Sequence, residues 1–206
     1  MIDPYDLSHP WDRNRLEEWI LFGICVANKP ADPTAVKVDA VLNTLREEIV
    51  NVCSFFPECE TPPTPFELVG MAAESNMLRK ILKKHKVGQY TRIERAFREV
   101  VEKIKDPLNT TVEELETVHG IGPKTARMIM LYYKPETACV PLDTHVLKWL
   151  RAQGYDAPKG TPSGKKYLEL ENIFILEAYK RGMSVKDLDS QVWAYYALPQ
   201  KQSKPK

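Results

Sequence analysis

Apolar residues recur three and four positions apart along most of the chain, and this spacing is what most restricts its fold. The stretch 12–27, for example, places Leu16, Trp19 and Ile20 on one helical face behind Asp12, a residue suited to cap a helix. No stretch alternates apolar and polar residues in the way that a half-buried strand does. The sequence therefore predicts an all-α protein of roughly nine or ten helices joined by short loops.

Capping residues and prolines mark where these helices begin. Thr111 and Glu114 have the spacing of a capping box, and Thr64 and Ser75 are predicted to cap two further helices. Residues 57–65 contain four prolines and no helical spacing, which predicts a connector. The predicted helices cover about 12–27, 33–52, 64–73, 144–152, 164–181 and 185–197, and others begin near 75, 91, 111 and 123.

The composition excludes several classes of protein. The 206 residues include 29 Lys and Arg against 28 Asp and Glu, with 43% hydrophobic residues, which fits neither a disordered chain nor a membrane protein. The first residues lack the basic start and apolar run of a secretory signal, so an intracellular location is expected. The four cysteines are scattered without the close spacing of metal ligands, so no metal cluster is expected.

Positive charge is concentrated in one part of the sequence. Residues 79–105 contain ten basic residues and three acidic ones. We expect Lys83, Lys84 and Lys86 within this stretch to contact DNA phosphates, because the local sign of the charge governs attraction to nucleic acid. A solvated surface with no partner is the alternative interpretation.

The most informative segment is 115–127, in which Gly120 and Gly122 flank Ile121 between two helical patterns. Two glycines allow a tight turn in which Ile121 enters the core while consecutive backbone N–H groups face outward. Pro123 then begins a helix whose positive dipole end favours a phosphate. A plain corner between two helices is the alternative interpretation of this turn.

The segment 140–146 follows, reading Val-Pro-Leu-Asp-Thr-His-Val. The two segments together resemble the helix-hairpin-helix (HhH-GPD) DNA glycosylase superfamily. The closest likeness is to its endonuclease III-like branch, which combines a Gly-x-Gly-x-Lys-Thr-Ala hairpin with a Val-Asp-Thr-His segment. Fainter likeness extends to 24–28 and 86–90. The resemblance implies a two-lobed helical fold with a central lobe of 10–136, carrying the hairpin at about 112–133, and a second lobe of 1–9 plus 137–206.

The same resemblance implies an activity and a set of site residues. Lys124 falls on the catalytic lysine of the family and Asp143 on its essential aspartate, while Asn28 replaces a glutamine that probes the gap left by an extruded base. The implied DNA-binding residues of the hairpin are His119, Gly120, Ile121, Gly122 and Thr125. The implied activity is removal of a damaged base from double-stranded DNA, by default an oxidised pyrimidine, through a lysine Schiff base followed by β-elimination. A monomer associated with DNA in the cytoplasm, nucleoid or nucleus is expected.

The chain departs from the branch in one respect. The branch typically carries a four-cysteine iron–sulfur cluster near its C-terminus, whereas this chain has no cysteine after Cys139. We therefore expect a member without the cluster and without an organic cofactor. The resemblance also implies a monovalent cation held by backbone carbonyls of 118–122.

Several alternatives to this activity stay open. A monofunctional glycosylase would use a water activated by Asp143 as its nucleophile, and the specificity could instead be of the 8-oxoguanine type. A non-catalytic hairpin module would only clamp phosphates. A helical protein-interaction domain would bind no nucleic acid.

Overall fold

The structure, a computed structural model, describes residues 2–3, 10–27, 29–53 and 62–197, although it leaves the side chains of 50–53 and 197 undescribed. These residues form helices and no strand, which confirms the predicted all-α class. The α-helices are α1 (Arg13–Val26), α2 (Ala31–Cys53), α3 (Pro65–Glu74), α4 (Leu78–Lys84), α5 (Tyr90–Lys103), α6 (Val112–Glu116), α7 (Pro123–Tyr133), α8 (Thr144–Ala152), α9 (Gly164–Lys180) and α10 (Val185–Ala197). Two short 3₁₀ helices, η1 (Pro107–Asn109) and η2 (Pro135–Thr137), complete the set.

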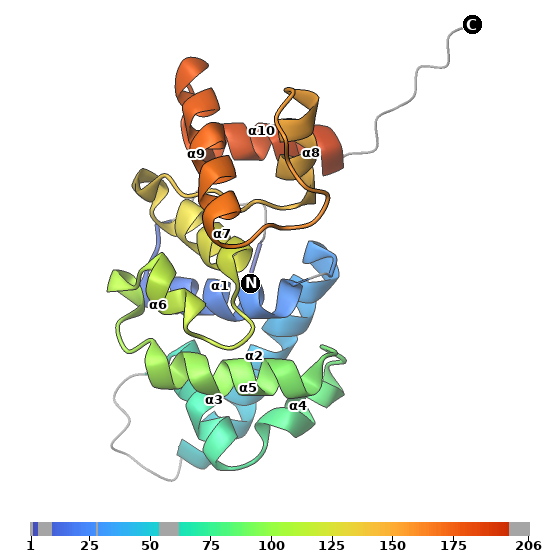
Figure 1. Cartoon of the computed structure of the whole chain (residues 1–206). Coiled ribbons are helices and arrows are strands. Elements are labelled where there is room, and N and C mark those ends of the chain that lie inside the picture. The colour runs from blue at the N-terminus through green and yellow to red at the C-terminus, as the bar shows by residue number, and fades with distance from the viewer. Residues whose placement is uncertain (1, 4–9, 28, 54–61, 198–206) are drawn as a thin grey trace, which may run out of the picture. The chain divides into compact units, whose positions relative to one another are not determined.

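The chain divides into two compact units (Figure 1). The N-terminal unit is Met1–Thr125 and the C-terminal unit is Ala126–Lys206, so the division falls inside α7. The sequence predicted a different division, with lobes of 10–136 and of 1–9 plus 137–206, and that assignment stays a prediction.

Helix α1 forms the centre of the N-terminal unit. It packs against α2, α3, α5 and η1, and its residues 19–25 are all buried. A helix that is apolar on every side must be enclosed by other elements. Helix α1 is buried in this way along 19–25, whereas its sequence predicted a single apolar face. Helix α5 shows the opposite pattern, because it buries Ile93, Ala96, Phe97 and Val100 and exposes a charged face.

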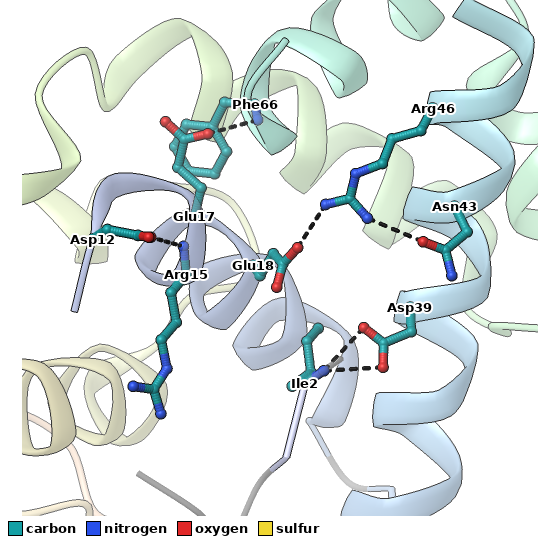
Figure 2. A network of polar contacts seen from close by, with 9 residues as sticks. All are labelled: Ile2, Asp12, Arg15, Glu17, Glu18, Asp39, Asn43, Arg46 and Phe66. Carbon is teal, nitrogen blue, oxygen red and sulfur yellow. Dashed lines mark hydrogen bonds and ion pairs between the residues drawn. The ribbon is translucent and has the colours of Figure 1, made fainter. Parts of the chain in front are cut away.

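A buried carboxylate joins α1 to the start of α3 (Figure 2). Glu17 is fully buried, and its Oε2 accepts a hydrogen bond from the Phe66 backbone N–H at 2.8 Å. Its other oxygen, Oε1, pairs with Arg13 Nε at 2.8 Å. The first N–H groups of a helix have no partner within the helix, so Glu17 supplies one from a different element. The contact fixes where α3 begins relative to α1.

Further polar contacts hold the surrounding segments in place (Figure 2). Asp12 caps α1 by accepting from the Arg15 N–H at 2.7 Å, as predicted. The Ile2 N–H donates to both oxygens of Asp39 in α2 at 3.0 Å. These contacts tie residues that precede α1 to α1 itself and to α2.

The predicted helix starts agree with the structure in most places. The capping box of Thr111 and Glu114 is confirmed, and Thr64 caps α3 in the same way. The prediction for Ser75 is wrong, because Ser75 ends α3 and its hydroxyl donates to the Met71 carbonyl at 2.8 Å. Helix α4 begins three residues further on, at Leu78, without a side-chain cap. Most of the predicted connector 57–65 lies outside the described residues.

In the C-terminal unit, α10 packs against α8 and α9. Leu147, Leu150, Phe174 and Leu188 are buried in this unit. Residues 138–143 belong to neither helix nor strand and lead into α8. Among the described residues, no helix has both the length and the apolar character needed to cross a bilayer.

Candidate nucleic-acid interface

Residues 117–122 form a tight hairpin between α6 and α7. The Ile121 side chain is 3% exposed, and its N–H donates to the Val118 carbonyl at 3.0 Å. Ile121 is therefore inserted into the core, as predicted. Gly120 has a φ of +83°, in the region that L side chains rarely adopt, which explains why glycine occupies this position.

The amide groups of the hairpin differ from the prediction. The sequence predicted that consecutive N–H groups face outward. In the structure, however, the His119 N–H donates to Glu99 Oε2 at 2.9 Å and the Ile121 N–H donates to the Val118 carbonyl. The prediction is wrong for these two groups, because α5 and the hairpin itself supply their acceptors. Within the described part of the chain, no hydrogen bond uses the N–H groups of Gly120 and Gly122. These two glycine amides are the hairpin donors left for a phosphate.

Glu99 connects the charged face of α5 to the hairpin. Its carboxylate accepts from Lys103 at 2.7 Å and from Arg95 at 2.8 Å, in addition to the His119 N–H. The Lys103 and His119 hydrogen bonds, together with Arg95, lower the pKa of Glu99 from its usual 4.5 to about 2. Glu99 is therefore ionised at neutral pH and holds the hairpin against α5.

Comparison with known families assigns this hairpin. A family model described as the helix-hairpin-helix motif matches residues 108–132, which span α6, the turn and most of α7. The chain carries a helix-hairpin-helix motif. Such motifs clamp the phosphate backbone of DNA with the backbone amides of the turn and the positive end of the second helix. The motif thus indicates DNA binding.

Lys124 lies directly after the hairpin, in the first turn of α7, and is half-buried. Thr125, the next residue, is 8% exposed. His119 is half-buried, and Gly120 and Gly122 are exposed. Lys124 is thus the cationic side chain next to the two glycine amides in the sequence. The roles assigned to these residues from the resemblance stay predictions.

The basic stretch 79–105 separates into two parts in the structure. On α5, Arg95 and Lys103 pair with Glu99, and Arg98 pairs with Glu94. Arg79 of α4 also pairs with Glu94. By contrast, Lys83, Lys84 and Lys86 are exposed and form no ion pair among the described residues. These pairs neutralise much of the charge on α5, whereas Lys83 and Lys84 at the end of α4, and Lys86 two residues beyond it, keep their charges available.

Asp143 caps α8 in the C-terminal unit. Its Oδ1 accepts from the N–H groups of His145 and Val146, both at 2.8 Å. Its Oδ2 makes no hydrogen bond within the described residues. The cap fixes the carboxylate and keeps one oxygen available for another group.

Side chains of α7 and α9 hold the extended segment that precedes Asp143. The Tyr167 hydroxyl donates to the Val140 carbonyl at 2.8 Å and accepts from the Leu142 N–H at 3.1 Å. Glu171 Oε1 accepts from the Val140 N–H at 2.8 Å and pairs with Arg127 at 2.7 Å. The buried backbone of this segment is thus satisfied by side chains, as neither a helix nor a sheet is present to do so.

Aromatic and cationic side chains surround the start of α8. The His145 ring lies 6.4 Å from the Tyr196 ring in a stacked arrangement and 6.4 Å from the Trp193 ring in an edge-on arrangement. Lys148 Nζ lies 4.6 Å from the Tyr196 ring centre. Tyr196, Trp193 and His145 are half-buried, so their rings are partly accessible. Aromatic faces beside a cation suit contacts with nucleobases and phosphates.

The remaining predicted site features have different outcomes. Asn28 lies outside the described residues. Lys124 belongs to the N-terminal unit and Asp143 to the C-terminal unit, and their joint action stays a prediction. The Gly120 carbonyl does not fit the implied cation site, because the Arg92 guanidinium already donates to it at 3.4 Å and would repel a second cation.

Sequence reasoning missed the residues that support these elements. Arg92 and Glu99 contact the hairpin from α5, and Tyr167 and Glu171 contact the segment before Asp143 from α9. Arg92 stood out only as one of ten basic residues. Tyr167 had no signal beyond its place on an apolar helical face.

Proposed function

We propose that this chain is a DNA glycosylase with associated lyase activity, which removes a damaged base from double-stranded DNA. The observation that carries the proposal is that the helix-hairpin-helix motif leads directly into Lys124. An amine in that position lies next to the element that clamps the DNA backbone. The default substrate is an oxidised pyrimidine, following the resemblance described above.

In this proposal Lys124 is the nucleophile. Its uncharged amine attacks C1′ of the damaged nucleotide, so that a C–N bond forms while the glycosidic bond breaks and the base leaves with a proton. The C1′–O4′ bond of the sugar then breaks, O4′ takes the remaining proton of the nitrogen, and a Schiff base between Lys124 and C1′ results. Removal of a proton from C2′ then expels the 3′ phosphate by β-elimination, which cleaves the strand.

Asp143 stabilises the positive charge that develops on the sugar as the base leaves. The free Oδ2 supports this role, because the cap holds the carboxylate in one orientation while leaving an oxygen available. The rings of His145, Trp193 and Tyr196 support contacts with bases in the same region of the C-terminal unit.

The experiment measures base release in a single turnover on duplexes that carry thymine glycol or dihydrouracil. Asp143→Asn should slow base release about a hundredfold or more, because asparagine retains the helix cap but loses the charge. Asp12→Asn is the matched control, since Asp12 caps α1 through the same kind of contact. It should leave the rate unchanged.

The outcomes separate the proposed activity from its alternatives. An unchanged rate in Asp143→Asn would remove Asp143 from the mechanism. Release of the base without any covalent adduct would favour the water mechanism. DNA binding without base release on a broad set of lesions, including 8-oxoguanine, would identify a non-catalytic hairpin module.

A further inference from the structure

Arg92, in the first turn of α5, joins three parts of the N-terminal unit. Its Nη2 donates to the Ile24 carbonyl near the end of α1 at 2.9 Å, and its Nε donates to Gln89 Oε1 at 2.7 Å. Its Nη1 donates to the Gly120 carbonyl of the hairpin at 3.4 Å. All three acceptors are uncharged. The N–H groups of the planar guanidinium point in fixed directions, so they connect separate segments of the chain instead of pairing with an acid.

Gly120 gives independent evidence that the hairpin backbone lies directly on this arginine. A Cβ atom added at Gly120 would lie 2.9 Å from Arg92 Nη1 and 3.8 Å from the Ala96 Cβ. The approach therefore excludes any side chain at Gly120 unless Arg92 moves. Close packing of this kind makes the position of the hairpin depend on the position of the guanidinium.

A second cation fixes the turn between α4 and α5. Lys29 Nζ donates to the Val87 carbonyl at 2.8 Å, and burial lowers the pKa of Lys29. Three residues of this turn, Lys86, Gly88 and Gln89, have positive φ values of 51°, 77° and 47°. For Lys86 and Gln89, which carry side chains, this conformation persists only where the surroundings hold it. Lys29 holds the Val87 carbonyl in the middle of the turn, and Arg92 holds the Gln89 side chain at its end.

We propose that Arg92 is a positioning residue for DNA binding, which fixes the hairpin against α1 and the turn before α5 without contacting DNA itself. The proposal rests on the proposed DNA-binding function of the hairpin. With Glu99 holding the His119 amide and Arg92 holding the Gly120 carbonyl, the peptide groups on either side of the turn are fixed. The Gly120 and Gly122 amides can then face one phosphate without further ordering.

A lysine cannot replace this arginine in such a role. It carries the same charge, but its ammonium group is a single point on a flexible stem and cannot reach three separate acceptors at once. Arg92→Lys therefore keeps the positive charge of the side chain but removes the planar arrangement of its N–H donors. If charge alone mattered, the lysine variant would bind DNA as the unmodified protein does.

The experiment measures the affinity of the full chain for an undamaged duplex over a range of salt concentrations, together with hydrogen exchange of individual amides without DNA. Arg92→Lys and Arg92→Gln should both weaken binding about tenfold with the same salt dependence as the unmodified protein. The His119 and Ile121 amides should exchange several times faster in both variants. Arg98→Lys on the same helix is the matched control, because among the described residues Arg98 pairs with Glu94 alone. It should change neither the affinity for DNA nor the exchange of these amides.

Three results would overturn the proposal. Binding by Arg92→Lys that equals the unmodified protein would show that only charge matters. A salt slope in Arg92→Gln that falls by about 0.9 would show a direct phosphate contact. Unchanged exchange at His119 and Ile121 would show that Arg92 does not hold the hairpin.

If the unmodified protein binds no DNA, the proposed function fails, while the exchange measurement still decides whether Arg92 fixes the hairpin.

Discussion

At the scale of single residues, the two candidate catalytic groups depend on side chains that do no chemistry themselves. Tyr167 is 2% exposed, and its hydroxyl both donates to Val140 and accepts from Leu142. One hydroxyl thus satisfies two buried backbone groups directly before Asp143. Burial also raises the pKa of Tyr167, so the hydroxyl stays protonated at neutral pH and remains able to donate.

Replacing this hydroxyl should loosen the start of α8. Tyr167→Phe leaves the Val140 carbonyl and the Leu142 N–H without their partner, which should lower the free energy of unfolding by about 1–3 kcal/mol. Denaturant unfolding measures this change, and amide exchange at His145 and Val146 should become faster. Tyr155→Phe is the matched control, because it removes a hydroxyl that bonds Glu177 elsewhere in the same unit. Equal effects of the two variants on the His145 amide would contradict the account.

Glu99 predicts how the hairpin responds to acid. Its pKa in the folded protein is about 2, below the usual 4.5, so its contribution to stability is complete above about pH 5. The contribution is lost as the pH falls from about 4.5 toward 2, because the protonated acid no longer holds Lys103, Arg95 and the His119 amide. Glu99→Gln should therefore lower the midpoint of denaturant unfolding at pH 7 but have progressively less effect toward pH 2.

The control for this prediction is Glu102→Gln, on the exposed surface of the same helix. It should shift the unfolding midpoint little at any pH. A Glu99→Gln effect that stays constant between pH 7 and pH 3 would mean that the carboxylate charge does not stabilise the fold.

At the scale of elements, α4 and α5 have different charges available to a partner, because α4 carries four basic residues and no acid whereas α5 carries four basic residues and three acids. Arg95 and Arg98 of α5 are paired with Glu99 and Glu94, whereas Lys83 and Lys84 at the end of α4 have no such pairs among the described residues. We therefore expect α4, and not the charged face of α5, to contribute to the attraction for DNA. The charges on each helix could be counted from the sequence, but the pairing of the α5 acids with Arg95, Arg98 and Lys103 is seen only in the structure.

Replacing both lysines with serine should weaken DNA binding and reduce its salt dependence. Each phosphate contact that is lost lowers the salt slope by about 0.9, so Lys83→Ser with Lys84→Ser should reduce it by up to about 2. Binding to a duplex at several salt concentrations measures the slope. Lys159→Ser with Lys165→Ser removes two exposed lysines of the C-terminal unit as a control. An unchanged slope in the α4 variant would make its lysines a solvated surface.

The elements differ in how far the sequence could predict them. The sequence could predict the capping box of Thr111 and Glu114 and the burial of the Ile121 side chain. Both features depend on residues that lie only a few positions apart. Ser75 was assigned to the wrong helix because both neighbouring helix ends can use a hydroxyl. The contact of Glu99 with the His119 amide was not predictable, since it joins elements that only tertiary packing brings together.

At the scale of the whole molecule, the two proposed functions make different demands on the chain. Phosphate binding by the hairpin uses α6, the turn and Lys124, which belong to the N-terminal unit, together with α7, which continues into the C-terminal unit. Base excision needs Lys124 and also Asp143 of the C-terminal unit to act on one nucleotide. Sequence resemblance alone suggested this partnership, as neither residue is distinctive by itself.

The most direct test of the account is borohydride trapping on duplexes that contain an abasic site or thymine glycol. Reduction of a Schiff base links the protein covalently to DNA. We predict an adduct for the unmodified protein and for the control Lys165→Gln, and none for Lys124→Gln, which should still bind DNA. An adduct that persists in Lys124→Gln, or its absence from the unmodified protein while base is released, would contradict the assignment of Lys124 as the nucleophile.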